Sequence, residues 1–205
     1  MKKLIPILGI LAFFAMNSCK KKNLTYQIKG TVHDSSLNAP LAGAQVVIKA
    51  SSSGSATITL ATLTTDANGN YSYELKRDKY QGITISVTKA NYFSDGSTST
   101  LDNLSLEDDN TFNYNMYARS WVRLHFVSDG TKVIKYYKQG GKNGCAECCP
   151  TGEIQLDNVI DQSVYCINDG NTLYKIFYDV QGTTNNGTLQ VNTIPFDTTE
   201  LLISY

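Results

Sequence analysis

The sequence predicts an all-β fold in which one β-domain follows another. The first observation is composition: the 205 residues include 13 Tyr and 15 Gly, and only 18% are charged. Tyrosine suits half-buried pleated strands, and glycine suits the tight turns that join them. The second observation is the alternation of apolar and polar residues in many segments. No segment after the first 22 residues keeps a helical period over three turns.

Alternation locates the predicted strands in order along the chain. From Tyr71 to Lys76, the side chains of Tyr71, Tyr73 and Leu75 alternate with polar ones. Because successive side chains of a strand point to opposite faces, each such segment is expected to bury one face. The other alternating sets are Tyr26, Ile28 and Val32; Ala44, Val46 and Ile48; Ile83, Ile85 and Val87; Val122, Leu124 and Phe126; Tyr174, Ile176, Tyr178 and Val180; and Leu201, Ile203 and Tyr205.

The N-terminal segment resembles the leader of a bacterial lipoprotein. Two lysines precede an apolar run, Leu4–Met16, and Asn17-Ser18 then leads to Cys19. A positive start, a short apolar stretch and a small residue before the cut are typical of secretory leaders. The resemblance implies removal of residues 1–18, lipidation of Cys19 and a tether over residues 19–24. Plain secretion with a different cleavage site is the alternative.

The apolar run of the leader is too short for a transmembrane anchor. It has 13 residues, whereas a helix needs about 20 to cross the bilayer core, and Pro6 and Gly9 interrupt it. Contact with the membrane is therefore expected through the lipid anchor. The expected location is the bacterial cell envelope, at the outer membrane, after export.

The charge balance of the folded part argues against one class of partner. The whole chain has 18 basic and 18 acidic residues; leaving out the five lysines of the leader and tether gives 13 basic against 18 acidic residues. Nucleic-acid-binding domains usually show a clustered basic surface. No nucleic-acid partner is expected.

The segment Asp66–Asn70 lies between two alternating runs and contains Asn68-Gly69. Asn-Gly supplies the positive backbone dihedrals that short hairpin loops need. A calcium loop of the EF type would require Gly at its sixth position and Glu at its twelfth, where this chain has Tyr71 and Arg77. The spacing therefore predicts a hairpin turn and no metal site.

Residues 25–118 resemble the carboxypeptidase regulatory-like domain. The resemblance is carried, in this order, by Tyr26–Val32, Asn38–Ile48, Thr65–Tyr71 and a strand over Ile83–Tyr92. It implies a transthyretin-like β-sandwich that acts as an accessory module without catalytic residues. No functional residue is carried over from this resemblance.

Residues 119–205 are expected to form a second, β-sandwich-like domain, which begins after Ala118 and resembles no recognised family. A single sandwich with long insertions is the alternative, with Gln139–Gly152 as one such insertion. Within the first domain, the polar segment Ser97–Asn110 is predicted to be an exposed loop.

Four cysteines remain after Cys19 is set aside: Cys145, Cys148, Cys149 and Cys166. An even number of cysteines in an exported protein predicts disulfides. A bond between the neighbours Cys148 and Cys149 would be strained, so each is expected to pair with Cys145 or Cys166. A zinc site and a redox-active pair are the alternatives, but no paired ligand knuckles and no following helix support them.

No catalytic motif, metal site or cofactor site is expected. His33 and His125 are scattered and are interpreted as ordinary strand residues. The pairs Tyr136-Tyr137 and Tyr71/Tyr73 could stack on sugar rings, but strand tyrosines usually pack across a sheet, and packing is the preferred interpretation.

Three functional hypotheses follow from the sequence. The preferred one is a non-enzymatic lipoprotein of the cell envelope that binds or scaffolds glycan or protein partners. The alternative is a structural or adhesive subunit of the fimbrial type that assembles by strand exchange and donates Thr198–Tyr205. The third is a hydrolase whose site has no recognisable motif.

Overall fold

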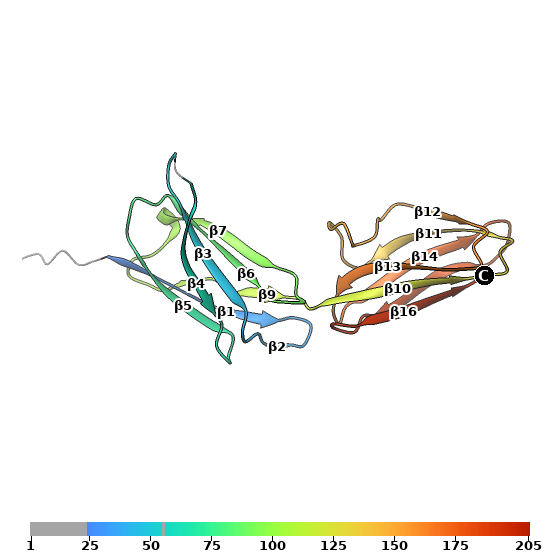
Figure 1. Cartoon of the computed structure of the whole chain (residues 1–205), viewed down its shortest axis with the longest axis horizontal. Helices are drawn as coiled ribbons and strands as arrows, with labels where there is room; N and C mark the ends of the chain where they lie inside the picture. The colour runs from blue at the N-terminus through green and yellow to red at the C-terminus, as the bar shows by residue number, and fades with distance from the viewer. Residues whose placement is uncertain (1–23, 55) are drawn as a thin grey trace, which may run out of the picture.

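The structure is a computed structural model that describes residues 24–54 and 56–205. The predicted leader and Cys19 lie outside the described residues. Two β-sandwiches stand end to end, and the described part of the chain contains one short 3-10 helix, η1 (Leu101–Asn103), and no α-helix (Figure 1). The predicted all-β fold, a transthyretin-like sandwich followed by a second sandwich, is confirmed.

The first sandwich contains two sheets. In one, β1 (Thr25–Asp34) pairs antiparallel with β2 (Ala39–Pro40) and β5 (Asn70–Lys76), and parallel with β8 (Asn110–Thr111) and β9 (Tyr114–Met116). The order of the other sheet is β4-β3-β6-β7, formed by β4 (Ile58–Thr64), β3 (Gln45–Ser51), β6 (Gly82–Thr88) and β7 (Asp95–Thr100).

The core of the first sandwich lies between these sheets. It consists of the inward side chains that alternation predicts, together with residues from the connecting segments. Its buried members are Tyr26, Ile28, Val32, Leu41, Ala44, Val46, Ile48, Tyr71, Leu75, Ile83, Ile85, Val87, Tyr92, Leu101, Tyr114, Met116 and Ala118.

The second sandwich also contains two sheets. The first, with order β13-β10-β16, is formed by β13 (Asp161–Asp169), β10 (Arg119–Val127) and β16 (Thr198–Ser204), and β16 runs parallel to β10. The second, with order β12-β11-β14-β15, is formed by β12 (Ile154–Asp157), β11 (Val133–Gly140), β14 (Leu173–Val180) and β15 (Asn186–Asn192).

A separate core fills the second sandwich. The rings of Phe126 and Tyr136 meet at its centre, with centroids 4.8 Å apart. The other buried members are Val122, Leu124, Ile134, Cys166, Tyr174, Ile176, Val180, Leu201 and Ile203.

Two local predictions were wrong. Asp66–Asn70 does form a turn, in which Gly69 has φ +75°, but it connects β4 to β5 in the other sheet and closes no hairpin. Asn-Gly determines the tight reversal of the chain, whereas tertiary packing within the first sandwich determines which of its two sheets each strand joins. The segment Ser97–Asn110 begins in β7, because Ser97–Thr100 pairs with β6, and the exposed loop is shorter than predicted.

Gly30 occupies an inward position of β1 where a side chain has no room. A Cβ atom there would lie 1.7 Å from the carbonyl oxygen of Phe112 and 2.9 Å from Cε1 of Tyr71. Tyr71 uses this space to donate a hydrogen bond of 2.7 Å from its hydroxyl to that same oxygen of Phe112. The missing side chain at residue 30 thus lets β5, β1 and the segment after β8 close together.

We expect Gly30→Ala to lower the free energy of unfolding of the first sandwich by about 3 kcal/mol or more, because backbone must move to admit the methyl group. Gly152→Ala is the matched control, since nothing lies within 4 Å of a Cβ atom there, and it should change stability by about 0.5 kcal/mol at most. Urea unfolding measures both. Equal effects of the two changes would contradict the packing described at Gly30.

Candidate functional site

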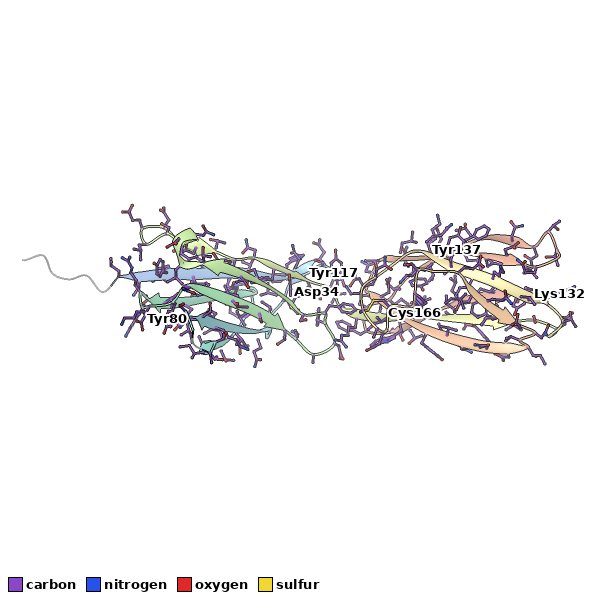
Figure 2. The ribbon with its side chains drawn as sticks, turned by 90° about the horizontal axis from the view of Figure 1, so that it is seen from above. Asp34, Tyr80, Tyr117, Lys132, Tyr137 and Cys166 are labelled. Carbon is purple, nitrogen blue, oxygen red and sulfur yellow. A yellow bond between two sulfur atoms is a disulfide. The ribbon has the colours of Figure 1, made fainter. Side chains whose placement is uncertain are left out.

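Asp34, at the end of β1, is buried where the first sandwich faces the second (Figure 2). Its Oδ1 accepts hydrogen bonds from the backbone N–H groups of Ser36 (2.8 Å) and Leu37 (3.0 Å), and its Oδ2 accepts one from the Tyr92 hydroxyl (2.6 Å). Burial, and then the hydrogen bond to this carboxylate, raise the pKa of Tyr92. A buried carboxylate with three donors is a satisfied group, and here it fixes the turn after β1.

The junction between the sandwiches contains no flexible linker. The chain leaves β9 at Met116, and β10 begins at Arg119. The backbone N–H of Arg119 donates to the carbonyl oxygen of Asn91, and that of Gly170 donates to Ala118, both over 2.8 Å. Backbone hydrogen bonds on both sides of the crossing point therefore hold the connection.

Side chains add contacts across the junction. The ring of Tyr92 meets that of Phe196 edge-on, with centroids 5.3 Å apart at 70°. Asn171 donates from Nδ2 to the carbonyl oxygen of Ser36 over 3.1 Å. These contacts connect the turn fixed by Asp34 to two loops of the second sandwich.

The loop after β11 also reaches the first sandwich. Its Lys142 ammonium lies 3.8 Å from the ring centroid of Phe93 and 2.7 Å from a carboxylate oxygen of Asp169. The first contact is a cation–π interaction, which gains strength when it is shielded from water. The loop that carries three of the cysteines therefore supports the junction.

The predicted disulfides are confirmed. Cys145 bonds to Cys148 within the loop, and Cys149 bonds to Cys166 of β13. Cys166 is buried in the second sandwich, near the end that faces the first (Figure 2). The second bond attaches the loop to β13, and closing a loop in this way typically contributes a few kcal/mol.

Lys138 of β11 holds the backbone of the same loop. Its side chain is buried, and Nζ donates to the carbonyl oxygens of Lys142 (2.7 Å), Cys148 (2.5 Å) and Cys149 (2.7 Å). Three acceptors match the three protons of an ammonium group. Burial lowers the pKa of Lys138.

His125 connects three strands on the outer side of β13-β10-β16. Its Nδ1 lies 2.5 Å from Oε1 of Glu200 on β16, and its Nε2 lies 2.9 Å from Oδ1 of Asp161 on β13. These hydrogen bonds, that of Glu200 first, raise the pKa of His125. The interpretation of His125 as an ordinary strand residue therefore did not anticipate that it bonds to Glu200 and Asp161 on the two neighbouring strands. We call this pair of contacts the His125 clasp.

The tyrosines considered for sugar stacking separate into two groups. Tyr71 and Tyr136 are buried and Tyr73 is partly buried, as cross-strand packing predicts. Tyr137 is 37% exposed on the outside of the second sandwich (Figure 2). Its ring lies beside that of Phe177, with centroids 5.4 Å apart. Tyr137 thus packs across the sheet against the neighbouring strand, as the preferred interpretation expects, while part of its side chain remains exposed.

Within residues 24–54 and 56–205, no group of three or more His, Cys, Asp or Glu side chains is placed to hold a metal ion. No helix in the same residues is both long and apolar enough to cross a membrane.

Sequence reasoning missed Asp34, Lys138 and Phe177. Asp34-Ser-Ser does have the composition of a turn that a side chain can cap, so Asp34 had a local signal. Lys138 and Phe177 had none, because burial of a lysine and contact between rings on neighbouring strands depend on the tertiary fold.

Comparison with known proteins gives one family match. Residues 27–116 match the model of the carboxypeptidase regulatory-like domain, within the region where the sequence resembles that family. None of the curated proteins matches the chain.

The solved structures that match this chain include bacterial pilins. The shaft pilin SpaA of Lactobacillus rhamnosus GG is 12% identical and has a TM-score of 0.36, covering 88% of this chain and 97% of the pilin. A minor pilin of Streptococcus agalactiae is 12% identical, with a TM-score of 0.36 and coverage of 87% and 94%. A streptococcal ancillary pilin is 11% identical, with a TM-score of 0.38; 90% of this chain matches 63% of that one.

We expect Lys138→Met to lower the free energy of unfolding of the second sandwich by about 2–4 kcal/mol, because it leaves three buried or partly buried carbonyl oxygens without their donor. Lys135→Met is the matched control on the same strand. Lys135 forms a partly exposed ion pair with Glu153, and such pairs contribute little. Chemical unfolding under oxidising conditions measures both, and a loss no larger than that of the control would refute the role given to Lys138.

The raised pKa of His125 predicts that its clasp depends on pH. The stabilisation is fully present below the unfolded value, about 6.5, and is lost as pH rises through the higher folded value. Between about pH 6 and about pH 9, the melting temperature of the second sandwich should therefore fall more in the wild type than in His125→Gln.

Calorimetry at a series of pH values measures this difference. His33→Gln, which changes the other histidine of the chain, should keep the steeper pH dependence of the wild type. Parallel curves for the wild type and His125→Gln would rule out the clasp as a pH-dependent contact.

Proposed function

We propose that this protein is an exported, non-catalytic rod of the cell envelope, anchored by a lipid on Cys19, that holds its second sandwich away from the membrane. The observation that carries this proposal is the end-to-end arrangement. The described chain starts at the outer end of the first sandwich and finishes at the outer end of the second (Figure 1). An anchor at the N-terminal end would then place the second sandwich furthest from the lipid.

The junction supports a spacer role. Only two residues separate Met116 from the start of β10, and contacts from Tyr92, Phe196 and Lys142 surround the crossing point. Two domains connected by a bare linker would be expected to move relative to each other. Hydrogen bonds, a cation–π contact and a loop stapled by disulfides restrict that motion here.

The sequence supports the anchor. Residues 1–18 have the pattern of a secretory leader, and Lys20, Lys21 and Lys22 would lie close to lipid headgroups. Several acyl chains on one cysteine would hold the protein stably, whereas a single chain binds only marginally. The outer membrane of the envelope is the proposed location.

A non-catalytic role fits the first sandwich. Residues 27–116 match the carboxypeptidase regulatory-like domain, and the resemblance to that family implies an accessory module without catalytic residues. The rod would scaffold or bind, and the exposed faces of the second sandwich are the surfaces it offers to a glycan or protein partner.

Assembly by strand exchange is the second candidate function, favoured by one observation. The strand expected to be donated, Thr198–Tyr205, is β16 plus one residue, and β16 is an edge strand at the C-terminal end of the chain. It pairs with β10 of its own chain and buries Leu201 and Ile203, so exchange would first have to release it. Assembly that increases with concentration in sedimentation measurements would favour this function.

The anchored rod is tested by expressing the full precursor and comparing it with Cys19→Ala. We expect the wild type in the membrane fraction, with the added mass of acyl chains on Cys19, and Cys19→Ala in the soluble fraction. Scattering from the soluble protein should give a radius of gyration well above the about 16 Å of a single compact globule of this length.

Lys20→Ala is the control, because it changes the neighbouring residue and leaves the thiol in place; it should remain in the membrane fraction. Equal mass and equal solubility of the wild type and Cys19→Ala would disprove the lipid anchor. A radius of gyration near that of a globule would disprove the rod.

A further inference from the structure

The outer face of the sheet β12-β11-β14-β15 presents its side chains in rows that cross the strands. Strand register places Tyr137 of β11 opposite Phe177 of β14, and Phe177 opposite Thr188 of β15. These three residues form a row in the middle of the face, which we call the aromatic row. Two rings and a hydroxyl group thus occupy neighbouring positions on three adjacent strands.

The aromatic row is accessible. Tyr137 is 37% exposed, Phe177 is partly exposed and Thr188 is exposed. The two ring planes are inclined by 33°, with centroids 5.4 Å apart. Large aromatic side chains are usually buried in cores or at interfaces. Two neighbouring rings that remain partly exposed are therefore candidates for contact with a ligand.

A β-bulge brings an amide to the edge of the aromatic row. The register of β11 with β14 shifts between Lys138 and Gly140, and Gln139 is the extra residue. Its Nε2 lies 3.5 Å from the Tyr137 hydroxyl and its Oε1 lies 3.4 Å from Oγ1 of Thr188. Both distances are at the long limit for hydrogen bonds, so the amide can exchange these partners for a ligand. Bulges often re-aim a side chain at a functional site.

Charges next to the aromatic row compensate each other. In the adjacent row, Lys135 stands opposite Asp179 and forms an ion pair of 2.9 Å with Glu153. On the other side, Gln190 stands opposite Lys175. The immediate surroundings of the rings therefore contain amides, hydroxyls and charges of both signs.

We propose that the aromatic row and Gln139 form a binding site for a neutral glycan. A pyranose ring has an apolar face of C–H bonds that fits against the electron-rich face of an aromatic ring, and its hydroxyls need the paired donors and acceptors that amides and hydroxyls supply. An anionic polymer would need a basic surface, which this face lacks. The proposal deepens and rests on the proposed function, since the rod would hold this face away from the membrane.

The test uses the purified full chain and affinity electrophoresis in gels that contain neutral polysaccharides: mannan, xylan, mixed-linkage β-glucan or soluble starch. We expect at least one of them to retard the wild type. Tyr137→Ala and Phe177→Ala should each weaken that binding by roughly tenfold or more, because each removes a stacking surface. Gln139→Ala should weaken it as well.

Tyr165→Ala is the matched control. Tyr165 is a more exposed tyrosine, at 58%, on the outer face of the other sheet, and its removal should leave the retardation unchanged. Melting temperatures of all variants show whether they fold. The proposal is overturned if none of the four polysaccharides retards the wild type, or if Tyr165→Ala weakens binding as much as Tyr137→Ala does. Neither result would affect the anchor or the rod, which fractionation and scattering test separately.

Discussion

The buried carboxylate of Asp34 is the interaction on which the end-to-end arrangement depends. It holds the turn after β1 and the hydroxyl of Tyr92 together at one end of the first sandwich. From that fixed surface, Ser36 receives a hydrogen bond from Asn171, and the ring of Tyr92 contacts Phe196. A charged group inside a protein is tolerated only when its partners are all in place. The geometry of the junction therefore depends on a set of donors that must be complete.

The loop after β11, which carries three of the cysteines, is likewise held in place by a set of contacts, here in the second sandwich. A short loop rich in glycine and polar residues would normally be mobile, but two disulfides and the ammonium of Lys138 hold its backbone. That rigidity matters because Lys142, in the same loop, contacts Phe93 across the junction. Rigidity in a loop is here a means of aligning two separate cores.

Much of this fold is predictable from residue patterns, because each strand buries one face and alternation records which face that is. The disulfides are predictable too, since an even number of cysteines behind a predicted secretory leader leaves few options. Partnership between strands is not local: Asn68-Gly69 indicates a turn, and nothing in it reveals that β4 and β5 belong to different sheets. Of the candidate glycan site, Tyr137 could be named from the sequence. Phe177 could not, because it lies 40 residues away in the chain and only cross-strand register places it next to Tyr137.

Strand direction gives the rod a mechanical property. In each sandwich the first strand pairs in parallel with the last: β1 with β8 and β9, and β10 with β16. Tension between the N-terminal end of β1 and the C-terminal end of β16 would pull the two members of each pair in opposite directions along their length. Because the ladder bonds run across the strands, they would be loaded together in shear, and none would open first as in a zipper. Resistance to pulling is thus built into the topology of both sandwiches.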